Sequence, residues 1–115
     1  DGFWSASYPY EGAKELGDRF EAEYGKDSVP VGAFYANAQV LMQAIEKAGS
    51  TDSEAVGAAI RGATFDNTVV GPLAFDDTGF ALITSVATQW WEGRHQLMFP
   101  TGDWTYRPAP DWDAR

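Results

Sequence analysis

The hydrophobic period of this chain changes once along its length, and that change limits the folds it can adopt. From Gly12 to Arg61, apolar residues recur every three or four positions, which is the spacing of amphipathic helices. From Thr68 onward the period falls to two, which is the spacing of β-strands. The 115 residues allow one core, at roughly 100–150 residues per domain. The order of elements predicts the α/β class: a strand and three helices, followed by β-hairpins.

Glycines mark the expected ends of the three helices. The first helix is expected from Gly12 to Gly25, with one apolar face formed by Ala13, Leu16, Phe20 and Tyr24. The second is expected from about Ala33 to Ala48, where Gly49 stops it. The third begins at Thr51, because Thr51 and Glu54 have the S/T-x-x-E spacing of a capping box, and it runs to about Arg61, with Gly62 as its stop. In the second helix a wide apolar stripe is predicted, formed by Phe34, Ala38, Leu41, Met42, Ile45 and Ala48.

Short extended segments bounded by turn residues predict strands at Phe3–Tyr8, Thr68–Phe75, Phe80–Ile83, 86–91 and 96–99. Asp76-Asp77-Thr78-Gly79 is a strong turn sequence, so the adjacent carboxylates are interpreted as turn residues and not as a catalytic pair or a calcium loop. Residues 101–115 have no period and are expected to form a loop that packs by its aromatic rings.

Composition excludes several classes of function. The chain has 17 acidic and 8 basic residues, and its net charge of −9 would repel the phosphates of nucleic acid. It has no cysteine, and its only histidine, His95, is expected to lie exposed on a turn without a second imidazole for a metal site. No serine lies in a G-x-S-x-G setting. We therefore predict no catalytic residue, no metal, no cofactor and no enzyme.

Three strings of residues resemble the leucine/isoleucine/valine-binding family, the type I periplasmic binding proteins that serve ABC importers. Residues 68–79 (TVVGPLAFDDTG) are similar to the family's T-V-x-G-P-L-x-[FW]-D-x-x-G hairpin. Residues 34–38 (FYANA) lead into 44–50 (AIEKAGS), as in a family helix that closes with A-I-x-x-A-G-S, although Asn37 stands where many members have Asp. Residues 20–25 (FEAEYG) are close to F-x-x-x-Y-G.

The resemblance implies that this chain is the last part of a two-lobed protein whose ligand is trapped between the lobes. Residues 1–10 would be a hinge-crossing strand. Residues 11–83 would be the C-terminal part of the N-terminal lobe, with three helices and a β-hairpin. Residues 84–115 would hold a hinge-crossing strand, a hairpin and the aromatic tail. The chain begins at Asp1 without an initiator methionine and is expected to be a trimmed fragment. The resemblance implies that most ligand-gripping residues, and much of the sheet that covers the helices, lie upstream.

The resemblance also implies where the ligand is touched. Contacts are expected from Gly32, Phe34 and Tyr35 at the start of the second helix, and from Tyr8. Gly32 stands where leucine-binding relatives offer an aromatic contact, so that a wider pocket is expected there. The alternative is that Phe34 and Tyr35 are ordinary core residues.

The resemblance implies, finally, a solute-binding component of an ABC importer for branched-chain or related amino acids or aromatic acids. Its partners would be that solute and a membrane permease. Its location would be periplasmic or extracellular, with a lipid anchor on an upstream N-terminus as one form of attachment. A ligand-sensing domain of a receptor or regulator on the same fold is the alternative. Unpaired strand edges and apolar faces predict that the chain self-associates.

Overall fold

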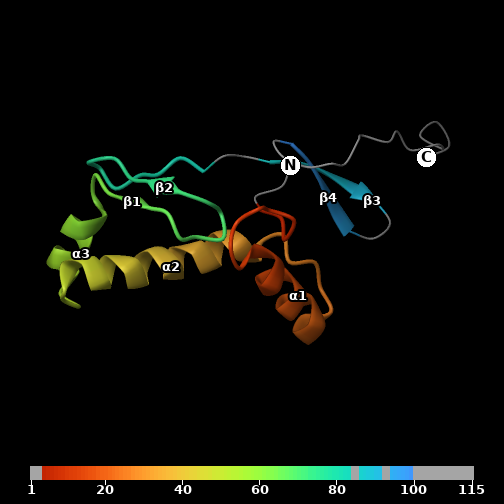
Figure 1. Ribbon diagram of the computed structural model, residues 1–115, viewed down its shortest axis with the longest axis horizontal. Helices are drawn as coiled ribbons and strands as arrows, with labels where there is room; N and C mark the ends of the chain where they lie inside the picture. Colours follow the sequence, from red (N-terminus) through yellow and green to blue (C-terminus); the bar gives the residue numbers. More distant parts are fainter. Residues whose placement is uncertain (1–3, 84–85, 92–93, 100–115) are drawn as a thin grey trace.

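The computed structural model describes residues 4–83, 86–91 and 94–99, and Figure 1 shows how their helices and strands are arranged. In chain order the elements are α1 (Ala13–Tyr24), α2 (Val31–Ala48), α3 (Ser53–Ile60), β1 (Thr64–Phe65), β2 (Leu73–Ala74), β3 (Ala87–Trp91) and β4 (Arg94–Phe99). β1 pairs with β2 and β3 pairs with β4, both antiparallel. Three helices followed by strand pairs confirm the predicted α/β class.

The ends of α1 and α2 follow from the glycines behind them. Gly25 and Gly49 both have φ of 61°, the left-handed conformation that glycine adopts without steric cost. The Gly25 N–H donates to the Glu21 carbonyl at 2.9 Å, which satisfies one of the last helical acceptors. α2 begins at Val31, directly behind Pro30 and two residues earlier than the sequence predicts.

The cap of α3 lies one residue beyond the predicted one. Asp52 is the N-cap, and its Oδ1 accepts hydrogen bonds from the N–H groups of Glu54 at 3.1 Å and Ala55 at 3.0 Å. Thr51 is exposed and lies outside the helix. The capping box at Thr51 is therefore wrong, because the carboxylate of Asp52 reaches the free helix donors and its charge also favours that end of the helix dipole.

The strand expected at Phe3–Tyr8 is not formed by its described residues. Residues 4–10 run through turns, in which the Tyr8 N–H donates to the Ser5 carbonyl at 3.0 Å and the Ser7 N–H to the Ser5 hydroxyl at 3.1 Å. Local acceptors therefore satisfy the backbone that a neighbouring strand would otherwise pair. Trp4 is fully buried, and its Nε1 donates to the Val69 carbonyl at 2.8 Å, which fixes the start of this segment to the core.

The strand expected at Thr68–Phe75 shrinks to β2, and its partner β1 lies just upstream. The pairs are Thr64 with Ala74 and Phe65 with Leu73. Between the two strands the Gly71 N–H donates to the Thr68 carbonyl at 3.0 Å, so that the first half of the expected strand is a turn. Gly71 has φ of 89°, and a Cβ there would overlap the Tyr10 ring.

The turn predicted at Asp76–Gly79 is confirmed. Asp76 Oδ1 accepts hydrogen bonds from the Thr78 hydroxyl at 2.6 Å and from the N–H groups of Thr78 at 2.8 Å and Phe80 at 3.0 Å. These hydrogen bonds, led by that of the Thr78 side chain, lower the pKa of the Asp76 carboxyl below its ordinary value. Within the strand expected at Phe80–Ile83, the structure gives one antiparallel bridge, between Ala81 and Phe75.

The core lies between α2 and the chain that runs through β1 and β2, which extends along the helix in Figure 1. The helix presents small residues to this core, with Ala36, Val40 and Ala44 buried at a spacing of four. Gln39 and Gln43 of α2 also bind the loop between β1 and β2. Gln39 Oε1 accepts a hydrogen bond from the Val69 N–H at 2.9 Å, and Gln43 Nε2 donates one to the Asn67 carbonyl at 3.0 Å.

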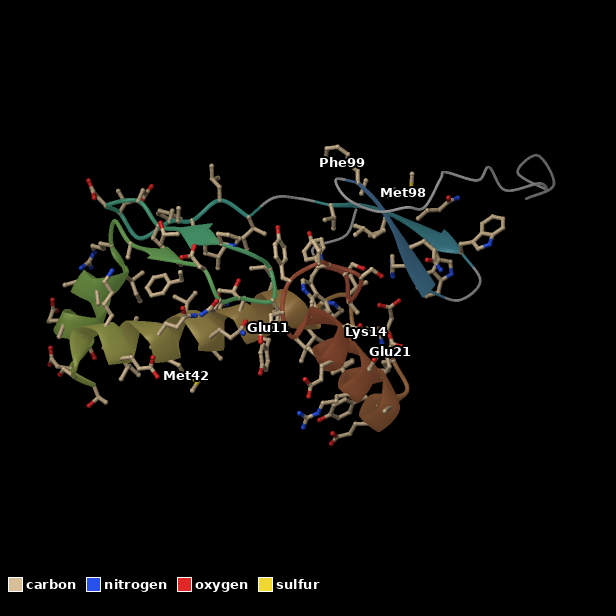
Figure 2. The ribbon with its side chains drawn as sticks, in the orientation of Figure 1. Glu11, Lys14, Glu21, Met42, Met98 and Phe99 are labelled. Atoms are coloured by element: carbon tan, nitrogen blue, oxygen red, sulfur yellow. The ribbon has the colours of Figure 1, made fainter. Side chains whose placement is uncertain are left out.

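Much of the apolar stripe predicted on α2 faces away from this core. Phe34 is 75% exposed, Met42 is 65% exposed and Leu41 is 49% exposed. Figure 2 shows Met42 on the side of α2 opposite β1 and β2. The helix thus has a small-residue face that the chain buries and a large-residue face that the described residues leave open, a pattern typical of a helix covered on both sides.

The hairpin predicted over residues 86–99 is present as β3 and β4. Thr88 lies opposite Leu97 and Trp90 opposite His95, with a bulge between Ala87 and Thr88. Leu97 is 4% exposed and joins the core cluster, so one face of the hairpin is seated against the rest of the chain. The tail expected at residues 101–115 lies outside the described residues.

Candidate functional site

Two of the four residues expected to touch a ligand are buried in packing contacts. Gly32 lies in the first turn of α2, where a Cβ would overlap the indole ring of Trp4. Instead of widening a pocket, glycine at this position makes room for that ring. Tyr8 is 8% exposed, and its ring meets Tyr10 edge-on at 5.5 Å. Burial, with the phenol of Tyr10 as a lesser cause, raises the pKa of Tyr8 above its ordinary value.

The other two expected residues project from the start of α2. Phe34 is 75% exposed and Tyr35 is 47% exposed, so neither belongs to the core of the described chain. Tyr35 lines a groove between α1 and α2, and Tyr8, Gly32 and Phe34 are not among the residues that line it. The structure therefore does not gather the four residues around one groove.

The groove between α1 and α2 has a volume of about 400 Å³. Helical spacing places Leu16, Phe20 and Tyr24 along its α1 wall, and Tyr35 and Gln39 form its α2 wall. The Phe20 and Tyr24 rings lie 4.8 Å apart between centroids. The sequence pattern predicted these α1 residues as one apolar face. It did not predict a groove, because the angle between two helices depends on contacts made elsewhere in the fold.

Charged residues line the same groove. Glu15, Arg19 and Glu23 all come from α1, and Arg19 Nη1 lies 3.7 Å from Glu15 Oε1 in an exposed ion pair. The groove thus combines apolar walls, three aromatic rings and an excess of one negative charge. Such a mixture is typical of small-molecule sites, which are mostly apolar with a few placed polar groups.

A second pocket, of about 300 Å³, lies between α1 and the β3–β4 hairpin and is mostly polar. His95 Nδ1 lies 3.0 Å from Asp27 Oδ2, and both side chains are about three-quarters buried, which corrects the exposed turn expected for His95. Lys14 and Glu21 line the pocket from α1, and Figure 2 shows them on the side of α1 that faces the hairpin.

The protonation of Asp27 depends on this contact. Burial, the largest single influence, opposes ionisation, but hydrogen bonds from His95 and the Val29 N–H together outweigh it. They hold the pKa of the Asp27 carboxyl below its ordinary value. Asp27 is thus a charged acceptor that joins the α1–α2 connection to β4.

Across residues 4–83, 86–91 and 94–99, no three His, Asp or Glu side chains are grouped so that they would hold a metal ion. In that same part of the chain, no helix combines the length and the apolar character needed to cross a bilayer.

An α/β unit with an open, aromatic-lined groove is typical of a ligand-binding domain. Comparison with protein families shows which one. A family model described as periplasmic binding protein matches residues 1–95, which is most of the chain, and the chain therefore belongs to the periplasmic binding protein family. This is a non-enzymatic family that binds small molecules. Among curated proteins, none matches the chain.

Proposed function

We propose that the chain is part of the solute-binding component of an ABC importer of the leucine/isoleucine/valine-binding type. The observation that carries this proposal is the family match over residues 1–95. The string at residues 68–79 adds support, since its resemblance to one branch of type I binding proteins is the most detailed in the chain. The solute would be a branched-chain or related amino acid, or an aromatic acid.

In this proposal the solute binds between the lobe described here and a second lobe. Phe34 and Tyr35 are the favoured contacts, because their exposed rings project from the first turns of α2. Gly32 and Tyr8 would support these contacts from the core. Gly32 leaves room for the Trp4 ring, and Tyr8 packs on Tyr10. Residues 1–10 and 84–115 would cross between the lobes, and residues 11–83 would belong to the N-terminal lobe.

The proposed partners follow from the same role. A solute-binding component works in the periplasm or outside the cell, where it delivers its solute to a permease in the membrane. We also propose self-association of this chain, supported by the open apolar face of α2. No charged residue occurs between Val31 and Ile45, so the net charge of −9 is carried elsewhere.

Uptake by intact cells tests this function. Deleting the gene should abolish high-affinity uptake of labelled leucine, phenylalanine or benzoate, and the gene supplied in trans should restore it. A Phe34→Ala, Tyr35→Ala double variant of the whole protein should bind that solute more weakly while keeping its circular dichroism spectrum. Uptake unchanged for all three solutes, together with altered expression of genes that respond to one of them, would instead establish the sensing alternative.

A further inference from the structure

We propose that the groove between α1 and α2 binds a small organic cation of the quaternary ammonium type. This site goes beyond the solute proposed above. Its walls come from two helices of one lobe, so it does not depend on a second lobe closing over it. Its volume of about 400 Å³ lies within the range of small-ligand sites.

The aromatic rings of the groove supply the attraction. Phe20 and Tyr24 follow each other by one helical turn on α1, and Tyr35 faces the groove from α2. Tyr24 is 57% exposed and Tyr35 is 47% exposed, so ring surface is open to a ligand. The face of an aromatic ring attracts a cation through its quadrupole, and rings arranged around a pocket are a common way to bind methylated ammonium groups.

The charges on the groove select the sign of the ligand. Arg19 is already paired with Glu15, whereas Glu23 makes no ion pair within the described chain. An unpaired carboxylate beside exposed rings favours a cation and disfavours an anion. The rest of the chain acts in the same direction, since its net charge is −9.

The probe is choline, with two matched comparisons. 3,3-Dimethyl-1-butanol has the same shape without the charge, and glycine betaine keeps the trimethylammonium group but adds a carboxylate. Binding is followed by the NMR shifts of the Tyr24 and Tyr35 ring signals in the 115-residue chain. Choline should bind in the millimolar range, because the groove is open on one side. The neutral analogue should bind at least about fivefold more weakly if each of two rings contributes as exposed cation–π pairs do.

Variants locate the site. Tyr24→Leu and Tyr35→Leu should each weaken choline binding by about two- to fivefold. Glu23→Gln should weaken it by about twofold and reduce its dependence on salt. The control is Glu46→Gln, an equally conservative change at an exposed position near the end of α2, outside the groove. It should leave choline binding unchanged.

Three results would overturn the proposal. The first is no shift of either tyrosine signal at about 100 mM choline, far above the expected millimolar range. The others are equal binding of choline and its neutral analogue, and equal effects of Glu23→Gln and Glu46→Gln. Betaine binding as tightly as choline would also overturn it, since Arg19 would then be receiving a carboxylate. Tyr35 is shared with the proposed solute contacts, so the variants at Tyr24 and Glu23, which line the groove alone, separate failure of this site from failure of the uptake function.

Discussion

The Asp27 carboxylate and the His95 imidazole lie 3.0 Å apart, although 68 positions separate them in the chain. This contact joins the connection between α1 and α2 to strand β4. The Val29 N–H donates to the other oxygen of Asp27 at 2.9 Å and so orients the carboxylate toward His95. Together with the burial of Leu97 in the core cluster, the contact ties the β3–β4 hairpin to the rest of the chain.

We expect Asp27→Ala to loosen the hairpin. The free energy of unfolding should fall by roughly 1 kcal/mol at pH 7, the scale of a partly exposed charged hydrogen bond. Amide hydrogen exchange should accelerate in β4 more than in α2. Exchange measured by mass spectrometry checks this, with Asp66→Asn, an exposed carboxylate, as the control. Equal exchange in β4 for both variants would contradict the role given to this contact.

The same contact should depend on pH with a definite sign. The pKa of Asp27 is lowered in the folded chain, so its contribution is present above the ordinary value of 3.8 and is lost as pH falls through the lower folded value. The stability difference between the wild type and Asp27→Ala should therefore shrink below about pH 4. Denaturant titrations at pH 7 and pH 3 measure that difference. A gap that widens on acidification would show that another group dominates.

Asp52→Ala should destabilise α3 by about 1 kcal/mol, because it removes the acceptor for two free helix donors. Thr51→Ala should be nearly silent, since Thr51 is exposed and lies outside the helix. Urea denaturation of the two variants compares the adjacent positions directly. A larger loss for Thr51→Ala would restore the capping box that the structure replaces.

Gly32→Ala should destabilise the chain by roughly 1–3 kcal/mol, the usual cost of overpacking, because the new methyl group overlaps the Trp4 indole. The matched control is Gly57→Ala in α3, where the added Cβ has room and should instead stabilise by about 0.5–1 kcal/mol. Thermal unfolding of both variants gives the comparison. Similar shifts of Tm in the same direction would refute the packing role of Gly32.

Static light scattering at micromolar concentration should give a mass above the 12.6 kDa of one chain, because association buries the exposed apolar face of α2. Met42→Lys should return the mass toward that of one chain, since it places a charge on this face. Asp66→Asn changes the net charge by the same amount elsewhere and should not. A wild-type chain that stays at 12.6 kDa would refute self-association.

Local chemistry explains why parts of the fold were predictable. The glycines behind α1 and α2 and the Asp76 turn depend on residues within about four positions of each other, a range over which side chains and backbone meet whatever the rest of the chain does. The cap of α3 was missed by one position, because Thr51 and Asp52 are both good caps and only the entry angle of the chain decides between them.

The candidate site was less predictable, because its parts are joined by distant contacts. Tyr35 was predicted as a ligand contact, but Tyr24 was assigned to the apolar face of α1, and nothing near either residue indicates that they border one groove. Gly32 was predicted to widen a pocket, but Trp4, which fills that space, comes from the segment that precedes α1.

Sequence patterns alone predict three helices, the glycine ends of α1 and α2, the Asp76 turn and the later hairpin, since each follows from a period or from hydrogen bonds between near neighbours. Which face of α2 is buried depends on packing against distant parts of the chain. Both faces are apolar, and the small one, with Ala36, Val40 and Ala44, lets the β1–β2 segment approach closely. The face with the large residues stays outside this core. Both faces are hydrophobic, so the face whose shape allows the closer packing is the one that is buried.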